Sequence, residues 1–196
     1  MSYKYHYTTV TIAVAGLFIG PLLFTQLAQA VGKASIILWS LIGALLCQVW
    51  GARMTGTDDY VPFIFSRLLA GMFSAMPTIL GPAYIMDILF LHQRGRVFAC
   101  YEISLLAGVV ASPTIGGFIV GTKSWPYTFW WTIGPVGAVS ILVFCFLEET
   151  GYPRDKDNRA WPTKPKGFIQ SRIATFFPGT KIVPRATLRD IVRATF

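Results

Sequence analysis

A small number of charged residues divide the sequence into five long apolar stretches. Each stretch holds roughly 20 or more consecutive uncharged residues, which is the length that an α-helix needs to cross a bilayer. β-Strands usually end after about 4–8 residues, so runs of this length predict helices. The stretches lie between Lys4 and Lys33, Lys33 and Arg53, Arg67 and Asp87, Glu102 and Lys123, and Lys123 and Glu148.

The composition of the whole chain also indicates a membrane protein. Charged residues make up 13% of it, whereas soluble domains average about 25%, so too few charges remain to cover a surface in water. We therefore predict an all-α, polytopic membrane protein in which residues 1–147 form a bundle of five transmembrane helices. The predicted spans are 8–31, 34–52, 63–89, 99–121 and 126–147.

The first span has a second interpretation. Lys4, the apolar run that follows it and Ala28-Gln29-Ala30 are similar to a signal peptide with a small-residue cleavage site. The apolar run is longer than the ~7–15 residues typical of such a peptide, and another span follows at once. We favour a transmembrane helix.

Residues 148–196 form a basic tail. They contain more than half of the 17 basic residues of a chain whose net charge is +8. Beside a membrane bundle, a basic segment is expected to meet anionic lipid headgroups, so we predict a lipid partner and no nucleic-acid partner. Because positive loops lie inside, we place the tail and the loop with Arg94 and Arg96 in the cytoplasm.

The tail also has the pattern of two amphipathic helices, which would lie in the headgroup plane. A solvated tail without fixed structure is the alternative. The residues that define the pattern are Ile169, Ile173, Phe176 and Phe177 in the first helix and Arg185, Arg189 and Arg193 in the second.

Small residues recur along the fourth span. Gly108, Ser112 and Gly116 are spaced by four residues and therefore share one helix face, which lets another helix approach closely. Pro113 lies within the same stretch and permits a kink. A plain packing face is a sufficient explanation of this pattern.

The same stretch resembles the fifth-helix antiporter motif of the major facilitator superfamily. It matches at Gly108, Pro113, Gly116 and Gly117 and departs at Ser112, where the family has glycine. Four further stretches resemble motifs of the family in the right order. They are Gly32-Lys33, Arg67 to Gly71, Asp87 with Arg94-Gly95-Arg96, and Phe146 to Thr150.

The resemblance is strongest to fungal drug:proton antiporters, which have twelve helices. It implies that the five spans correspond to helices two to six and that helix one and the second half are missing. The chain would then be a truncated transporter, inactive alone, with its N-terminus outside the cell. The implied partners are the missing helices, protons and an unknown small organic solute, and the implied location is the plasma membrane. A membrane scaffold or accessory protein without transport activity is the alternative function.

Candidate site residues follow from the resemblance. Arg67, Gly71 and Glu102 are the candidates for coupling to protons or substrate. Arg67 could instead extend to the outer interface, and Glu102 could be an interfacial residue near Arg96. The expected cytoplasmic gate comprises Gly32, Lys33, Asp87, Arg94, Gly95 and Arg96.

Two of these assignments leave alternatives open. Asp87 could form a charge clamp with Arg94 or lie at a solvated helix end. The aromatic residues from Trp125 to Trp131 are explained by an interfacial belt, with a substrate contact as the alternative.

The sequence offers no support for an enzyme. Cys47, Cys100 and Cys145 have apolar neighbours and no Cys-x-x-Cys spacing, so we expect free thiols. The two histidines, His6 and His92, are far apart in sequence. We predict no catalytic residue, no metal site and no cofactor.

Overall fold

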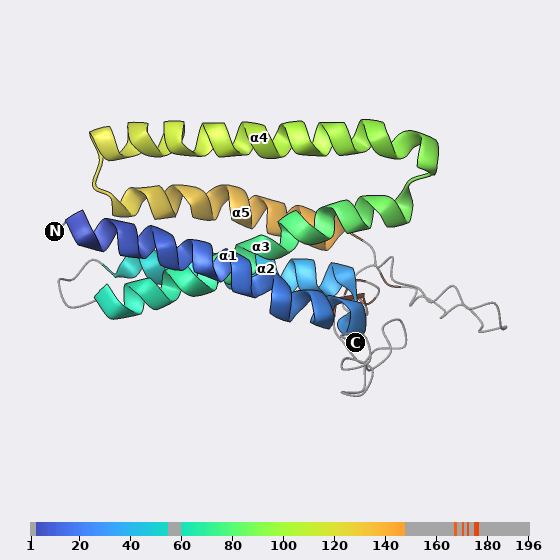
Figure 1. Cartoon of the computed structure of the whole chain (residues 1–196), viewed down its shortest axis with the longest axis horizontal. Coiled ribbons are helices and arrows are strands. Elements are labelled where there is room, and N and C mark those ends of the chain that lie inside the picture. The colour runs from blue at the N-terminus through green and yellow to red at the C-terminus, as the bar shows by residue number, and fades with distance from the viewer. Residues whose placement is uncertain are drawn as a thin grey trace.

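Five α-helices make up the body of the molecule (Figure 1). The computed structural model describes residues 3–54 and 60–147 together with 167, 170, 172, 175 and 176. All five helices are long and apolar enough to cross a membrane, which confirms the prediction of an all-α, multi-pass integral membrane protein. The helices are α1 (Tyr3–Val31), α2 (Lys33–Arg53), α3 (Tyr60–Ile88), α4 (Leu91–Thr122) and α5 (Pro126–Phe146).

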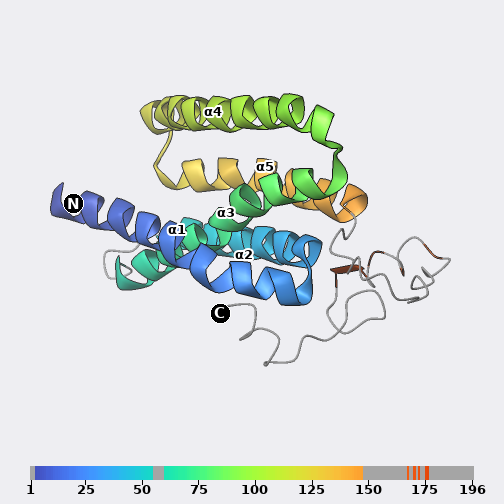
Figure 2. The same ribbon diagram turned by 45° about the vertical axis from the view of Figure 1, so that its right-hand side comes forward.

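Successive helices run in opposite directions along the bundle (Figure 2). The turn from α1 to α2 is a single glycine, Gly32, whose φ of 111° is a conformation that side chains other than glycine rarely adopt. The Gly32 amide donates to the Ala28 carbonyl, 3.1 Å away, and its own carbonyl accepts from Ile36. The Gly32 turn therefore closes one helix and begins the next within one residue.

Glycines bring α1 and α3 into direct backbone contact. A Cβ at Gly16 would overlap the carbonyl oxygen of Leu68, and one at Gly71 would overlap that of Ala13. A Cβ at Gly20 would come within 2.5 Å of the carbonyl oxygen of Met72. Lipid gives no hydrophobic force between helices, so small residues that allow close van der Waals packing hold such a pair together.

The apolar core lies where α2 meets α1, α3 and α5. Met76 of α3 is 0% exposed, and Ile36 and Ile37 of α2 are each 6% exposed. Val136 and Val143 of α5 pack against this cluster from the other side. Outward residues such as Phe18 and Phe146 are 73% and 77% exposed, as expected of side chains that face lipid.

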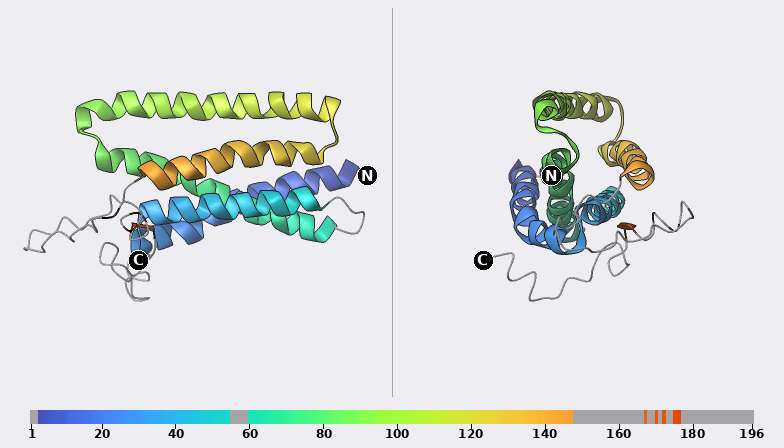
Figure 3. Two further views of the ribbon diagram at one scale, coloured as in Figure 1. Left: turned by 180° about the vertical axis from the view of Figure 1, so that it is seen from behind. Right: turned by 90° about the vertical axis from the view of Figure 1, so that its right-hand side faces the viewer.

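The fourth helix stands apart from the other four. Figures 1 and 3 show α4 joined to α3 and α5 at its two ends and separated from the bundle along most of its length. Within α4, all of which the structure describes, no residue is buried. The helix begins at Leu91, before the predicted span 99–121, and its first turns contain the polar and charged residues that precede the apolar run.

Most of the tail lies outside the described residues, including the predicted amphipathic helix with Arg185, Arg189 and Arg193. Of the first predicted amphipathic helix, Phe176 is described and is 1% exposed. Its contacts with α2 and α5 are given below.

Candidate functional site

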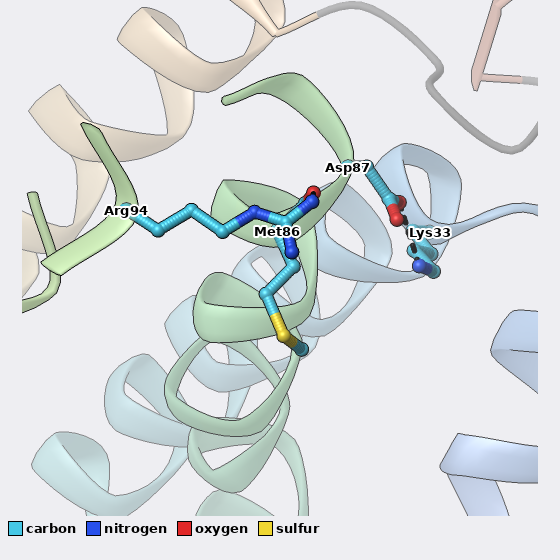
Figure 4. Close-up of polar contacts among 4 residues, drawn as sticks. All are labelled: Lys33, Met86, Asp87 and Arg94. Atoms are coloured by element: carbon cyan, nitrogen blue, oxygen red, sulfur yellow. Dashed lines mark hydrogen bonds and ion pairs between the residues drawn. The ribbon is translucent and has the colours of Figure 1, made fainter. Parts of the chain in front are cut away.

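An ion pair joins α2 to α3 at the end of the bundle where α1 turns into α2. Lys33 Nζ lies 2.6 Å from Asp87 Oδ2, and the two side chains are 26% and 30% exposed. Lys33 is the first residue of α2, directly after the Gly32 turn, and it faces Asp87 in the last turn of α3 (Figure 4). We call this end of the molecule the Lys33 end. Sequence spacing alone did not indicate this pair, whose members are 54 positions apart.

Arg94 binds the C-terminal turn of α3. Its Nη2 donates to the Met86 carbonyl at 2.8 Å and its Nε donates to the Leu89 carbonyl at 3.1 Å. The last carbonyls of a helix have no partner within the helix, and a cation there is favoured by the helix dipole. Arg94 therefore fastens the start of α4 to the end of α3.

Three of the predicted gate residues, Lys33, Asp87 and Arg94, take part in two separate contacts. Figure 4 shows Asp87 facing Lys33 and Arg94 reaching toward Met86 from the other side. Asp87 pairs with Lys33, whereas Arg94 donates to two backbone carbonyls. Gly95 and Arg96 are exposed on α4.

Arg67 lies at the opposite end of α3, between α2, α3 and α5. Its guanidinium carbon is 4.0 Å from the centroid of the Phe129 ring and 5.1 Å from that of Phe63. Its Nη2 makes a long hydrogen bond of 3.5 Å to Gln48 Oε1. These contacts hold the guanidinium between α2, α3 and α5, close to the helix ends opposite the Lys33 end.

The surroundings of Arg67 leave room for its guanidinium and leave one of its donors unsatisfied. A Cβ at Gly51 would lie 2.7 Å from Arg67 Nη2, so the absence of a side chain there leaves room for the guanidinium. Arg67 Nε is buried and has no hydrogen-bond partner among the described residues. A buried, unsatisfied donor on a cation attracts an anionic or carbonyl oxygen.

The other two coupling candidates lie elsewhere. Gly71 faces α1, where it permits the backbone approach described above. Glu102 is exposed on α4. Its neighbour Tyr101 donates to the Thr78 carbonyl at 3.0 Å and packs on Gly81, which makes a contact between α4 and α3 near the Lys33 end. The structure does not bring Arg67, Gly71 and Glu102 together.

The residues of the predicted antiporter motif lie on the isolated helix α4. Gly108, Ser112, Pro113 and Gly117 are exposed. A Cβ at Gly108 or Gly117 would meet nothing within 4 Å, and one at Gly116 would touch only the methyl group of Thr128 at 3.8 Å. Within the part of the chain that the structure describes, this small-residue face has no helix packed against it.

The profile of the major facilitator superfamily matches residues 5–193, almost the whole chain. The chain belongs to the major facilitator superfamily. This result confirms the family that the sequence motifs indicated.

Individual fungal members of the superfamily are also similar. An efflux pump of Floropilus chiversii is 27% identical over 141 residues, which is 72% of this chain and 26% of that protein. A transporter of Schizosaccharomyces pombe is 28% identical over 174 residues, or 85% of this chain and 32% of that protein. A multidrug transporter of Candida glabrata is 24% identical over 145 residues, 73% of this chain and 24% of that protein.

The chain therefore spans about a quarter to a third of the length of the relatives it matches. No solved structure gives a significant match.

Sequence reasoning missed several residues that shape these sites. Gly16 and Gly20 have the small-xxx-small spacing that was recognised only in the fourth span. Gln48 and Gly51 lie on one face of α2, three residues apart, but nothing in the sequence indicates that they meet Arg67. Phe129 was assigned to an interfacial belt, and its contact with Arg67 required the structure.

Proposed function

We propose that this chain forms part of a transporter that exports small organic solutes in exchange for protons. Membership of the superfamily and the relatives described as an efflux pump and a multidrug transporter support this proposal. They also favour transport over catalysis. The single structural observation that carries it is the inward position of Arg67, a cation that α2, α3 and α5 hold inside a membrane bundle.

The position of Arg67 suits coupling between a solute and a proton. A charge at membrane depth is costly and usually faces a protein interior or a polar cavity. Arginine keeps its charge, so Arg67 supplies a fixed positive field, and its unpaired Nε can donate to an oxygen. An acidic group that approaches Arg67 is stabilised as a carboxylate, because the positive charge attracts the anion that remains when the proton leaves. A solute or another helix would provide that group.

Contacts at the Lys33 end are suited to a gate. The ion pair of Lys33 and Asp87 is partly exposed, and such pairs contribute only ~0–1 kcal/mol, so they can break during a conformational cycle. Transporters of this type alternate access by rocking two bundles about a central site. The basic tail and the positive-inside rule support a cytoplasmic position for the Lys33 end, and we propose the plasma membrane as the location.

Helices outside this chain would complete the transporter. The face with Gly108, Ser112 and Gly116 is suited to close packing with another transmembrane helix. Since the chain spans about a quarter to a third of its relatives, we propose that the partner helix comes from the rest of the transporter. We further propose that the chain alone does not transport; solute efflux by the purified chain in proteoliposomes would contradict that.

Substitution of Arg67 in the complete transporter tests the role of this cation. We expect Arg67→Ala to abolish proton-coupled efflux and Arg67→Lys to reduce it, because lysine keeps the charge but loses the planar contact with the Phe129 ring. Arg53→Ala is the control, since Arg53 is exposed at the end of α2. Normal efflux by both Arg67 variants in membrane vesicles, at normal protein levels, would refute the proposal.

A further inference from the structure

A short segment beyond α5 folds back onto the Lys33 end of the bundle. Arg172 Nη1 donates to the Leu147 carbonyl at 2.9 Å, directly after the last residue of α5. This carbonyl belongs to the group that a helix leaves without an internal partner, and a cation beside it is favoured by the helix dipole.

The next two described residues bind α2 through their backbone. Ser35 Oγ donates to the Thr175 carbonyl at 3.0 Å, and Trp39 Nε1 donates to the Phe176 carbonyl at 3.2 Å. Ser35 and Trp39 are four residues apart and therefore share one face of α2. Two consecutive carbonyls thus accept hydrogen bonds from two donors on the same face of α2.

Between these hydrogen bonds, Phe176 fills an apolar slot. Its side chain is 1% exposed and packs with Ala34 and Leu38, which are 0% and 6% exposed on the same part of α2. Its ring also stacks on Phe144 of α5, with centroids 5.5 Å apart and an interplanar angle of 24°. Phe176 therefore touches α2 and α5 at once.

We propose that Arg172, Thr175 and Phe176 act as a strap that clamps the C-terminal end of α5 to the N-terminal half of α2. The residues that receive the strap, Ala34 and Ser35, directly follow Lys33, which pairs with Asp87 of α3. Docking of the strap and formation of the ion pair therefore order the same turn of α2. Release of the strap uncovers Ala34 and loosens this turn, so the position of the strap affects the ion pair of Lys33 and Asp87.

Cysteine accessibility tests the strap in the full chain. The three native cysteines are replaced by alanine, Ala34→Cys is introduced, and labelling by a bulky polar maleimide is timed in detergent micelles. We expect Phe176→Ala to speed labelling by at least about tenfold, because a tenfold shift in opening needs only ~1.4 kcal/mol and removal of a buried ring exceeds that. The matched control is Phe146→Ala, whose ring is 77% exposed, and it should leave the rate unchanged.

A second pair of variants separates strap release from general unfolding. Ala70→Cys reports on the core of α3, where Ala70 is 8% exposed, and it should stay protected in the Phe176→Ala background. Trp39→Phe removes one donor and keeps an aromatic ring, so it should speed labelling at position 34 alone. If Phe176→Ala also exposes position 70, labelling at position 34 in the Trp39→Phe variant decides between release of the strap and general unfolding. Unchanged labelling at position 34 in Trp39→Phe and Phe176→Ala, or an equal increase in Phe146→Ala, would overturn the proposal.

Discussion

Replacement of Gly71 by alanine should weaken the contact between α1 and α3. The added methyl group would overlap the carbonyl oxygen of Ala13 and lie 3.2 Å from the Leu17 amide nitrogen. Both atoms belong to the backbone of α1, so the clash cannot be relieved by a side-chain rotation and the helices must separate. Overpacking of this kind costs about 1–3 kcal/mol.

Gly117→Ala is the matched control because nothing lies within 4 Å of a Cβ at Gly117. Both substitutions lie within helices and gain helix propensity, about 1 kcal/mol in each case. This gain cancels when the variants are compared, so the difference between them isolates the steric cost. We expect Gly71→Ala to be less stable than Gly117→Ala by about 1–3 kcal/mol.

The free energy of unfolding of each variant can be measured by titration with sodium dodecyl sulfate in mixed micelles, followed by circular dichroism and tryptophan fluorescence. Gly16→Ala should behave like Gly71→Ala, because its Cβ would overlap the Leu68 carbonyl from the other helix. Equal stability of the Gly71→Ala and Gly117→Ala chains would show that α1 and α3 do not meet through their backbones, and the reasoning would fail.

Three more tests concern the Lys33 end and the cysteines. A double-mutant cycle with Lys33→Ala and Asp87→Ala should give a coupling of no more than about 1 kcal/mol that shrinks in high salt; a larger, salt-independent value would contradict the partly exposed pair. Arg94→Lys should speed amide hydrogen exchange at the start of α4, since one ammonium cannot reproduce the forked contact with two carbonyls, and unchanged exchange would contradict that contact. In micelles, N-ethylmaleimide should modify the exposed Cys100 before the buried Cys47, and peptide mass spectrometry showing the reverse order would refute the packing of α2.

The positions of the helices follow from local sequence. Charge-free runs longer than a strand predict five membrane helices, and all five are present. Some helices extend beyond the predicted membrane spans, because a helix can continue where the apolar run has ended. In α4 the helix extends to Leu91 through polar residues that a hydropathy pattern excludes from a span.

The candidate site was only partly predictable. Lys33, Asp87, Arg94 and Arg67 were recognised from family motifs, but their partners were not. Asp87 is seven positions before Arg94 along the chain, which suggested a clamp, whereas the fold places Asp87 beside Lys33 on another helix. Side chains that are distant in sequence meet according to how the helices pack, and the apolar pattern of each helix does not fix that packing.

Composition and the length of the apolar runs were sufficient to predict the class of this protein, and the order of the motifs was sufficient to predict its family. A segment that crosses a bilayer must satisfy its own backbone hydrogen bonds, and an uncharged run of about 20 residues does so as a helix. The tertiary structure decided which of these residues are close together. It placed Arg67 against Phe129 and Gln48, glycines of α1 against α3, and Phe176 between α2 and α5. Each of these contacts depends on how neighbouring helices approach one another, and that depends on the whole set of packed surfaces rather than on any one segment.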